Sequence, residues 1–402
     1  MSDSATPDHL LRPHVRPFQT VPVPHKESGQ VLAGLRNPSG ISPALVGIHP
    51  QMLPLVTMLQ GERTVDEIAA ATKAPPEVLK NLVDRLDEAG LLWGPTMERL
   101  EREAMTAIRE NGAMPIGAAA AFGDTAEAAA AALTELLATA DDPELGTAVL
   151  GIVAPHLDRQ RGGENYAAAY KALVGLQPPD RVVILGTNHF GLGDGVVMTR
   201  LAFETPLGRL EPDAAVLGTL ERTFGDRLFK DEIDLLAEHS IQLHSTWVRH
   251  LFPSAKVVAA LLPDPTRPMI DESGARVATR EFADGLRKAL AEAGGTTIFI
   301  ASADLSHVGL PFGDQAAVDE DRAGQVEAHD RAMLASYCAN DPDTFLSEMA
   351  GHRNPTRWCS LGNMWAVRTA SGGTAELLQY RVSLDEKRTT LVSSAAMALL
   401  PA

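Results

Sequence analysis

Short apolar segments alternate with helical segments from about Ala148 onward, and this alternation constrains the fold more than any other feature. The apolar segments are "AVLGIVA", "RVVILG", "AKVVAALL" and "TTIFIASA", and the helical ones include "YAAAYKALVGL" and "ATREFADGLRKALAEAG". Strands that are apolar along their whole length are typical of parallel sheets that helices cover on both faces. The sequence therefore predicts an α/β fold for residues 146–402, with a mostly parallel sheet flanked by helices.

Three of these predicted strands are followed within four residues by a histidine. His156 follows "AVLGIVA", His189 follows "RVVILG", and His307 follows "TTIFIASA", where Asp304 and Ser306 also lie. In open α/β sheets, ligands bind in the crevice beyond the carboxyl ends of the strands. One strand-end histidine alone is more often a loop residue, but three after three apolar strands favour a site.

A fourth polar cluster, "EHSIQLH", contains Glu238 and His239. Neutral imidazole is the commonest protein ligand for first-row divalent metals, so the histidines are a candidate metal site. His239 is our candidate acid–base residue, because an imidazole outside the metal shell can move protons near neutral pH. Asp304 is the second catalytic candidate, and Asp158, Glu238 and Asp304 could orient the imidazole rings through their second nitrogens.

Two further features have both a structural and a functional interpretation. Cys359 in "RWCSLGN" could approach the site, although a lone small residue before a helix is more often a packing residue. The segment "RQRGG", which begins at Arg159, could bind an anion through its backbone and Arg161, or could be a tight turn. The remaining histidines have no companion motif and are interpreted as structural or solvent-facing.

The N-terminal part has a different organisation. Thr64 is a plausible N-cap of one helix, and Pro75 and Pro76 begin a second one that ends at Gly90. Short helices followed by "GLLWG" predict a small winged helix-turn-helix domain in residues 1–100. An alanine-rich helical connector, residues 101–145, then leads to the α/β domain.

Composition excludes several classes of function. The chain has 402 residues and a formal charge of −17, which opposes binding to nucleic acids or anionic membranes. Its two cysteines, Cys338 and Cys359, form no CxxC motif, and no apolar run reaches the roughly 18 residues that span a bilayer. The N-terminus lacks the pattern of a secretory signal, so we expect a cytoplasmic protein.

Five motifs in order, "APHLDRQRGGENYAAAY", "ILGTNHFG", "TPLG", "EHSIQLH" and "SADLSHVG", resemble those of the Memo family. The prokaryotic members are called AmmeMemoRadiSam system protein B, and the resemblance runs from about Pro115 to the C-terminus. It implies a fold similar to that of the class III extradiol dioxygenases, whose iron is bound by two histidines and a carboxylate.

Transferred by motif, the resemblance implies that His156 and His189 are metal ligands and that His239 is the acid–base residue. Ser306 stands where the animal members have a cysteine, so Ser306, His307 or water would complete the metal shell. The implied metal is Fe(II) or copper, with zinc as an alternative.

The N-terminal block, which includes the stretch from Val31 to Ala71, is similar over about 75 residues to PqqD-like winged-helix modules, which hold leader peptides in peptide-modification systems. This resemblance implies a peptide partner, and the family name implies a radical-SAM companion protein. A DNA-binding winged helix is disfavoured by the near-balanced charge of this region, and a helical cap without a ligand is the simplest alternative.

Three functions are consistent with the sequence. The leading hypothesis is a metal-dependent, dioxygenase-like oxidoreductase that acts on a small molecule or a modified peptide. The second is a non-catalytic protein that binds a peptide or partner in the same cleft. The third is metal-assisted hydrolysis with zinc.

Overall fold

The computed structural model describes residues 6–25, 29–189, 195–269 and 273–402. The chain divides into two compact units, Met1–Asn111 and Gly112–Ala402. The division falls at the end of helix α5 (Pro95–Asn111), inside the segment that was expected to connect two domains. Each unit has a sheet and a hydrophobic core of its own.

The smaller unit contains a three-stranded antiparallel sheet, in the order β1 (Gln19–Pro24), β2 (Val31–Arg36) and β3 (Leu45–Ile48). In the described part of this unit every strand precedes the main helices, and the segment after them forms only an isolated bridge, between Leu92 and Val15. The winged helix-turn-helix therefore stays a prediction. The helices are α1 (Asp8–Leu11), η1 (Pro50–Met52), α2 (Leu53–Thr57), α3 (Val65–Thr72), α4 (Pro76–Glu88) and α5.

Local sequence explains where α3 and α4 begin. Thr64 Oγ1 accepts a hydrogen bond from the Glu67 backbone N–H, and the Glu67 carboxylate accepts one from the Thr64 N–H, which completes a capping box. Pro75 and Pro76 begin α4, as predicted. Leu79, Leu82, Val83 and Leu86 form the buried face of α4, whereas Val78 is 46% exposed.

The larger unit is built on an eight-stranded sheet whose centre is parallel. The four central strands lie in the order β5 (Gly151–Ala154), β10 (Thr297–Ser302), β6 (Arg181–Thr187) and β9 (Lys256–Leu262), and each pairs in parallel with the next. The prediction of an α/β fold with a mostly parallel sheet is thereby confirmed.

Antiparallel strands extend this sheet at both edges. β7 (Val197–Met198) pairs with β9, and β13 (Thr390–Leu400) pairs with β5. β13 also pairs with β12 (Thr374–Leu384) and with β11 (Asp304–Gly309). The two-residue strands β4 (Ala113–Met114) and β8 (Ala202–Phe203) form a separate parallel pair.

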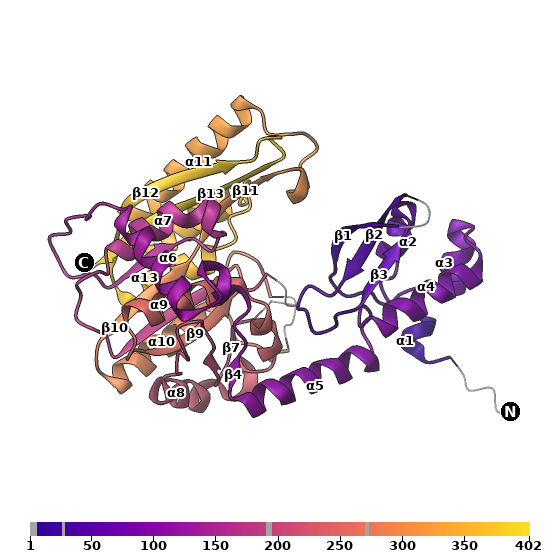
Figure 1. The fold of residues 1–402 in the computed structure, drawn as a ribbon, viewed down its shortest axis with the longest axis horizontal. Coiled ribbons are helices and arrows are strands. Elements are labelled where there is room, and N and C mark those ends of the chain that lie inside the picture. The colour runs from indigo at the N-terminus through magenta and orange to yellow at the C-terminus, as the bar shows by residue number, and fades with distance from the viewer. Residues whose placement is uncertain (1–5, 26–28, 190–194, 270–272) are drawn as a thin grey trace. The chain divides into compact units, whose positions relative to one another are not determined.

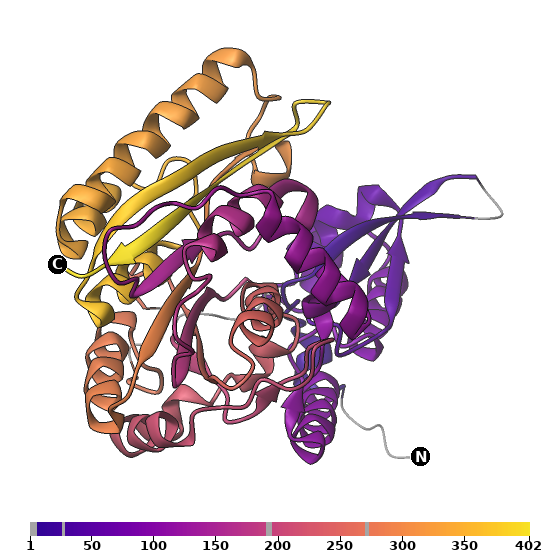
Figure 2. The same ribbon diagram turned by 60° about the vertical axis from the view of Figure 1, so that its left-hand side comes forward.

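Helices pack on both faces of the sheet, and this is why its central strands are apolar throughout. Val183 and Leu185 of β6 belong to the same core cluster as Phe282 and Leu361, whereas Ile184, which lies between them in sequence, is equally buried but outside that cluster. Helix α11 runs alongside the long pair β12 and β13 (Figures 1 and 2). The helices are α6 (Ala126–Ala138), α7 (Arg159–Lys171), α8 (Ala214–Phe224), α9 (His239–Leu251), α10 (Thr279–Ala293), α11 (Glu320–Ala339), α12 (Pro342–Gly351) and α13 (Leu361–Ser371), with the short 3-10 helices η2 (Gly117–Phe122), η3 (Gly225–Leu228), η4 (Glu232–Leu236) and η5 (Leu310–Phe312).

The strand that contains "TTIFIASA" does not end where the sequence suggested. After β10 the chain leaves the strand for one residue, Ala303, and continues as β11 against β13. The register shifts between Asp304 and His307. Asp304 and Ser306 are therefore buried inside a strand, at 2% and 0% exposure, instead of standing on a loop beyond it.

Candidate metal centre

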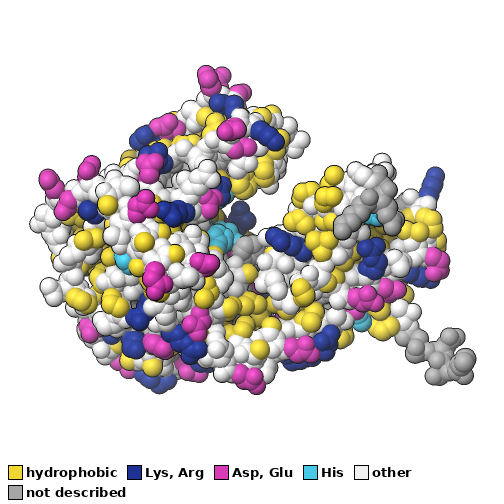
Figure 3. Space-filling model, in the orientation of Figure 1, with side chains coloured by type: hydrophobic (Ala, Val, Ile, Leu, Met, Phe, Trp, Pro, Cys, Tyr) yellow, Lys and Arg dark blue, Asp and Glu magenta, His cyan; other side chains and the backbone are white. Residues whose placement is uncertain are grey.

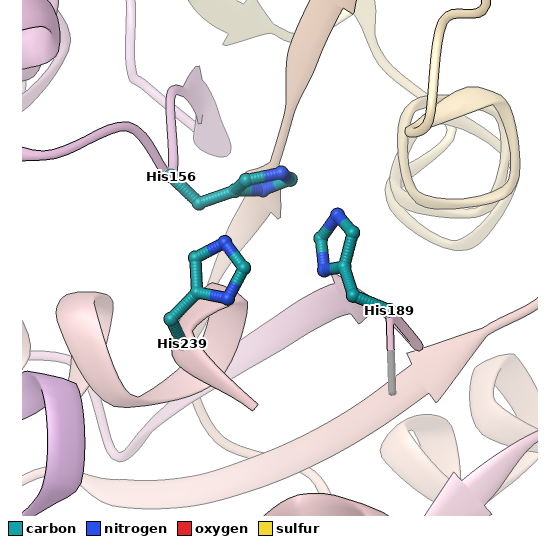
Figure 4. Close-up of side chains that lie close together, drawn as sticks. All are labelled: His156, His189 and His239. Atoms are coloured by element: carbon teal, nitrogen blue, oxygen red, sulfur yellow. The ribbon is translucent and has the colours of Figure 1, made fainter. Parts of the chain in front are cut away.

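Three histidines meet at the carboxyl edge of the central sheet. His156 follows β5, His189 follows β6, and His239 is the first residue of α9. One ring nitrogen from each lies within 4.8 Å of the others, and the rings point toward one another in Figure 4. The ring centroids of His189 and His239 are 4.7 Å apart, and that of His156 is 4.9 Å from His189 and 5.3 Å from His239.

A buried carboxylate, Glu238, orients two of these rings. Its Oε1 lies 3.0 Å from Nδ1 of His189 and 3.3 Å from Nδ1 of His239, and its Oε2 accepts a hydrogen bond of 2.7 Å from the His189 backbone N–H. Glu238 is held there because it is the N-cap of α9, where its side chain accepts from Ser240 N. A carboxylate at Nδ1 fixes the tautomer that leaves Nε2 as the ligand atom.

The surroundings of the histidines set their charge. Burial lowers the pKa of His156 well below its usual value and that of His239 to about 4, so both are neutral at pH 7. Burial acts in the same direction on His189, but hydrogen bonds to Cys359 and Glu238 outweigh it and raise its pKa well above the usual value. The same contact with His189 overcomes burial and lowers the pKa of Glu238.

Cys359 belongs to this cluster, although its sequence context favoured a packing role. Its Sγ lies 3.5 Å from Nε2 of His156, 203 residues earlier in the chain, and the thiol is also hydrogen-bonded to His189. The segment just before α13 carries it there. No local motif marks this residue as a ligand, and its position before a helix favoured a packing role.

Asp304 lies beside His156 on the buried side of the cluster. Its Oδ1 accepts a hydrogen bond of 3.0 Å from the His156 backbone N–H, and its Oδ2 is 3.4 Å from His156 Nε2. Ser302 Oγ holds the other ring nitrogen, Nδ1, at 3.0 Å. Burial raises the pKa of Asp304 to about 7, so this carboxyl can take up or release a proton near neutral pH.

The other two proposed ligands have different partners. Ser306 Oγ donates a hydrogen bond of 2.5 Å to Asp330 and accepts one of 3.1 Å from Trp358 Nε1. Nδ1 of His307 donates to Leu305 O at 3.0 Å, and burial lowers the pKa of His307. Since the register of β11 shifts between Asp304 and His307, strand alternation cannot bring all three side chains to one point. The structure places His239 and Cys359 beside His156 and His189, and the roles of Ser306 and His307 as ligands stay predictions.

The donor set fits a transition metal. Imidazole nitrogens and a thiol suit iron, copper or zinc, whereas magnesium and calcium prefer oxygen ligands. His156 and His189 with Cys359 would hold such an ion, and His239 faces the same point. Glu238 supplies the outer carboxylate that is usual behind a ligating histidine.

Replacing Glu238 with glutamine is expected to weaken metal binding by about 10- to 100-fold, because an amide no longer fixes the tautomer of His189. Competition of the purified protein with a zinc chelator of known affinity measures this change. Glu232→Gln is the matched control, since Glu232 is a buried carboxylate of the same unit that accepts a hydrogen bond from Thr199. Equal zinc affinity in the two variants would contradict the role assigned to Glu238.

An α/β unit with three histidines and a thiol at the edge of its central sheet defines a candidate metalloprotein. Residues 115–398 match the Memo-like protein family, and the chain therefore belongs to this family. The chain is 27% identical to a MEMO1 family protein of Aquifex aeolicus over 316 residues, which cover 77% of this chain and 79% of the relative. It is 29% identical to a MEMO1 family protein of Thermus thermophilus (70% and 80% covered) and 34% identical to one of Pyrobaculum aerophilum (60% and 86% covered).

The family resemblance expected from the sequence is thus confirmed for the larger unit. The family match begins at residue 115, so the PqqD-like resemblance of the smaller unit stays a prediction, as does the AmmeMemoRadiSam assignment. None of the helices in the described ranges is long and apolar enough to cross a membrane.

Proposed function

We propose that this protein is a metal-dependent, dioxygenase-like oxidoreductase whose ion is held by His156, His189 and Cys359. The observation that carries the proposal is the meeting of three histidine nitrogens within 4.8 Å, with the Cys359 thiol 3.5 Å from one of them. Bound iron or copper would supply one-electron chemistry at this point, whereas zinc would supply only Lewis acidity.

Two of the chain's own residues are suited to moving protons there. His239 is neutral at pH 7, because its pKa is about 4, and it faces the same point as His156 and His189. Asp304, with a pKa of about 7, exchanges protons near neutral pH, and its Oδ2 lies 3.4 Å from Nε2 of His156, the ring nitrogen that also faces Cys359. The two groups together form an acid–base pair around one reaction centre.

Metal-assisted hydrolysis is the rival function, because the same histidines and thiol also suit zinc. Non-catalytic binding of a peptide or partner in the same cleft is the second rival function. The nature of the metal and the response to oxygen separate all three functions.

The test is elemental analysis of anaerobically purified wild-type protein, followed by oxygen uptake with ascorbate as electron donor. We expect iron or copper near one ion per chain, and oxygen uptake by the iron- or copper-containing protein that the zinc-substituted protein lacks. Zinc at full occupancy without oxygen uptake would contradict the oxidoreductase proposal and favour metal-assisted hydrolysis. If the wild type contains only traces of all three metals, non-catalytic binding becomes the favoured function.

A further inference from the structure

A cavity of about 520 Å³ adjoins the metal centre, and arginines are the main charged residues of its lining. His189 and Cys359 line one part of it. Three arginines, Arg267, Arg280 and Arg357, also line it, and each pairs with one carboxylate: Arg267 with Asp264, Arg280 with Asp343, and Arg357 with Asp314. Each guanidinium has more N–H donors than one carboxylate takes up.

Two of these arginines are held in place from outside the cavity. Arg280 Nη1 lies 2.5 Å from Asp343 Oδ1, and its guanidinium stands 4.8 Å from the centre of the Trp365 ring. Arg357 Nη1 donates to His307 O at 2.8 Å, and Nη2 pairs with Asp314. A guanidinium has five N–H donors, and these contacts fix its position while using only some of them. Fixed cations with remaining donors are suited to a carboxylate or a phosphate.

The start of α10 adds backbone donors to the same wall. Ala278, Thr279 and Arg280 line the cavity, and Ala278 is the N-cap residue of this 15-residue helix. Alanine has no side-chain oxygen, and within the described ranges no side chain caps α10. The first N–H groups and the positive end of the helix dipole are therefore directed toward this wall of the cavity.

The backbone before Cys359 is strained in a way that builds the cavity. Arg353, Asn354 and Arg357 have φ values of 60°, 45° and 61°, in the left-handed region that residues other than glycine rarely adopt. Asn354 stabilises this turn through two hydrogen bonds of 2.8 Å with the backbone of Trp358. The turn brings Arg357, Trp358 and Cys359 onto one lining, and strained backbone of this kind is concentrated at functional sites.

Apart from Thr187, Asn188 and Asn354, apolar groups form the rest of the lining. They are Leu262, Pro263, Pro265, Pro268, Met269 and Trp358. A cavity of this size, mostly apolar with a few polar groups that converge, is typical of small-molecule sites. Histidine side chains reach the surface of the larger unit next to a basic side chain in Figure 3.

We propose that this cavity binds an organic substrate that carries a carboxylate or a phosphate. The anionic group lies against Arg280, Arg357 and the start of α10, and the apolar part packs on Trp358 and the prolines. This arrangement directs the reacting end of the substrate to His189 and Cys359. The inference names the substrate class of the proposed oxidoreductase and therefore rests on that function.

Calorimetric titration of the full-length protein with three probes tests the proposal. The probes are benzoate, phenyl phosphate and the neutral benzamide, each titrated into metal-depleted and into zinc-loaded protein. We expect at least one anion to bind about tenfold more tightly than benzamide, which corresponds to one or two charge-assisted hydrogen bonds. Tighter binding of benzoate identifies a carboxylate site, and tighter binding of phenyl phosphate a phosphate site.

Three variants locate the anion. Arg280→Gln is expected to reduce anion affinity by about tenfold and to leave benzamide affinity unchanged. Arg357→Gln, whose fold is checked by circular dichroism, should act in the same way. Arg287→Gln is the matched control, because Arg287 lies on α10, is 61% exposed and is outside the lining of the cavity. Its probe affinities should equal those of the wild type.

The anion site is overturned if benzamide binds as tightly as both anions, or if Arg280→Gln retains full anion affinity. Metal content is measured on the same samples, so the two proposals can fail separately. A protein that binds the anions more tightly than benzamide but binds no metal would contradict the oxidoreductase proposal and support the anion site. A protein that binds metal but does not distinguish the anions from benzamide would support the metal centre and contradict the anion site.

Discussion

Replacing both His156 and His189 with alanine is expected to lower bound iron or copper from about one ion per chain to background. The two imidazoles follow different strands, and both contact the Cys359 thiol. One thiol and one remaining histidine make too few ligands for a stable site, which usually needs three or four. Elemental analysis of anaerobically purified variant and wild type measures the loss.

The matched control removes two histidines of the same unit that lie outside the cluster, His250 and His352. The His250→Ala, His352→Ala variant should keep the wild-type metal content, and circular dichroism should show that both double variants are folded. Equal traces of metal in wild type and in the His156, His189 variant would contradict the metalloenzyme interpretation.

A single His239→Ala variant distinguishes whether His239 is a metal ligand or a proton acceptor. Loss of a proton acceptor leaves the metal content unchanged, whereas loss of a ligand lowers it.

The meeting of His156 and His189 could be predicted because it depends on a simple property of parallel sheets. Apolar runs identify the strands, and the carboxyl ends of parallel strands lie at one edge. Even so, β5 and β6 are not neighbours, since β10 lies between them in the sheet. The sequence predicted the edge at which the histidines lie without predicting the order of the strands.

Cys359 and Ser306 could not be placed from the sequence because their positions depend on long-range packing. Cys359 meets His156 across 203 residues, and the turn that directs it there contains three left-handed residues other than glycine, which no propensity predicts. Ser306 lies in β11 at a register shift, where the two-residue alternation of a strand fails.

The two residues are connected through a buried carboxylate of α11, Asp330, which is 0% exposed. Its Oδ1 accepts hydrogen bonds from Ser306 Oγ at 2.5 Å and from Trp358 Nε1 at 2.7 Å. Its Oδ2 accepts from Tyr380 OH at 2.8 Å and from Ser393 Oγ. One side chain thus ties β11, β12, β13 and the segment that carries Cys359 to a single helix.

Replacing Asp330 with alanine is expected to destabilise the larger unit by roughly 3–5 kcal/mol, because three buried donors and the half-buried Tyr380 hydroxyl lose their acceptor at once. Urea unfolding of the full chain measures this change in the free energy of unfolding. Tryptophan fluorescence is the probe, since Trp247, Trp358 and Trp365 all lie in this unit. Asp330→Asn keeps the shape and one acceptor oxygen, so it should fall between alanine and wild type.

The control is Asp321→Ala, which removes an exposed aspartate from the first turn of the same helix and should change stability by less than about 1 kcal/mol. Because Trp358 precedes Cys359 directly, Asp330→Asn should also weaken metal binding while the protein is still folded. An Asp330→Ala protein as stable as the Asp321→Ala control would mean that the four donors find other acceptors. In that case the position of Cys359 would depend on the strained turn alone.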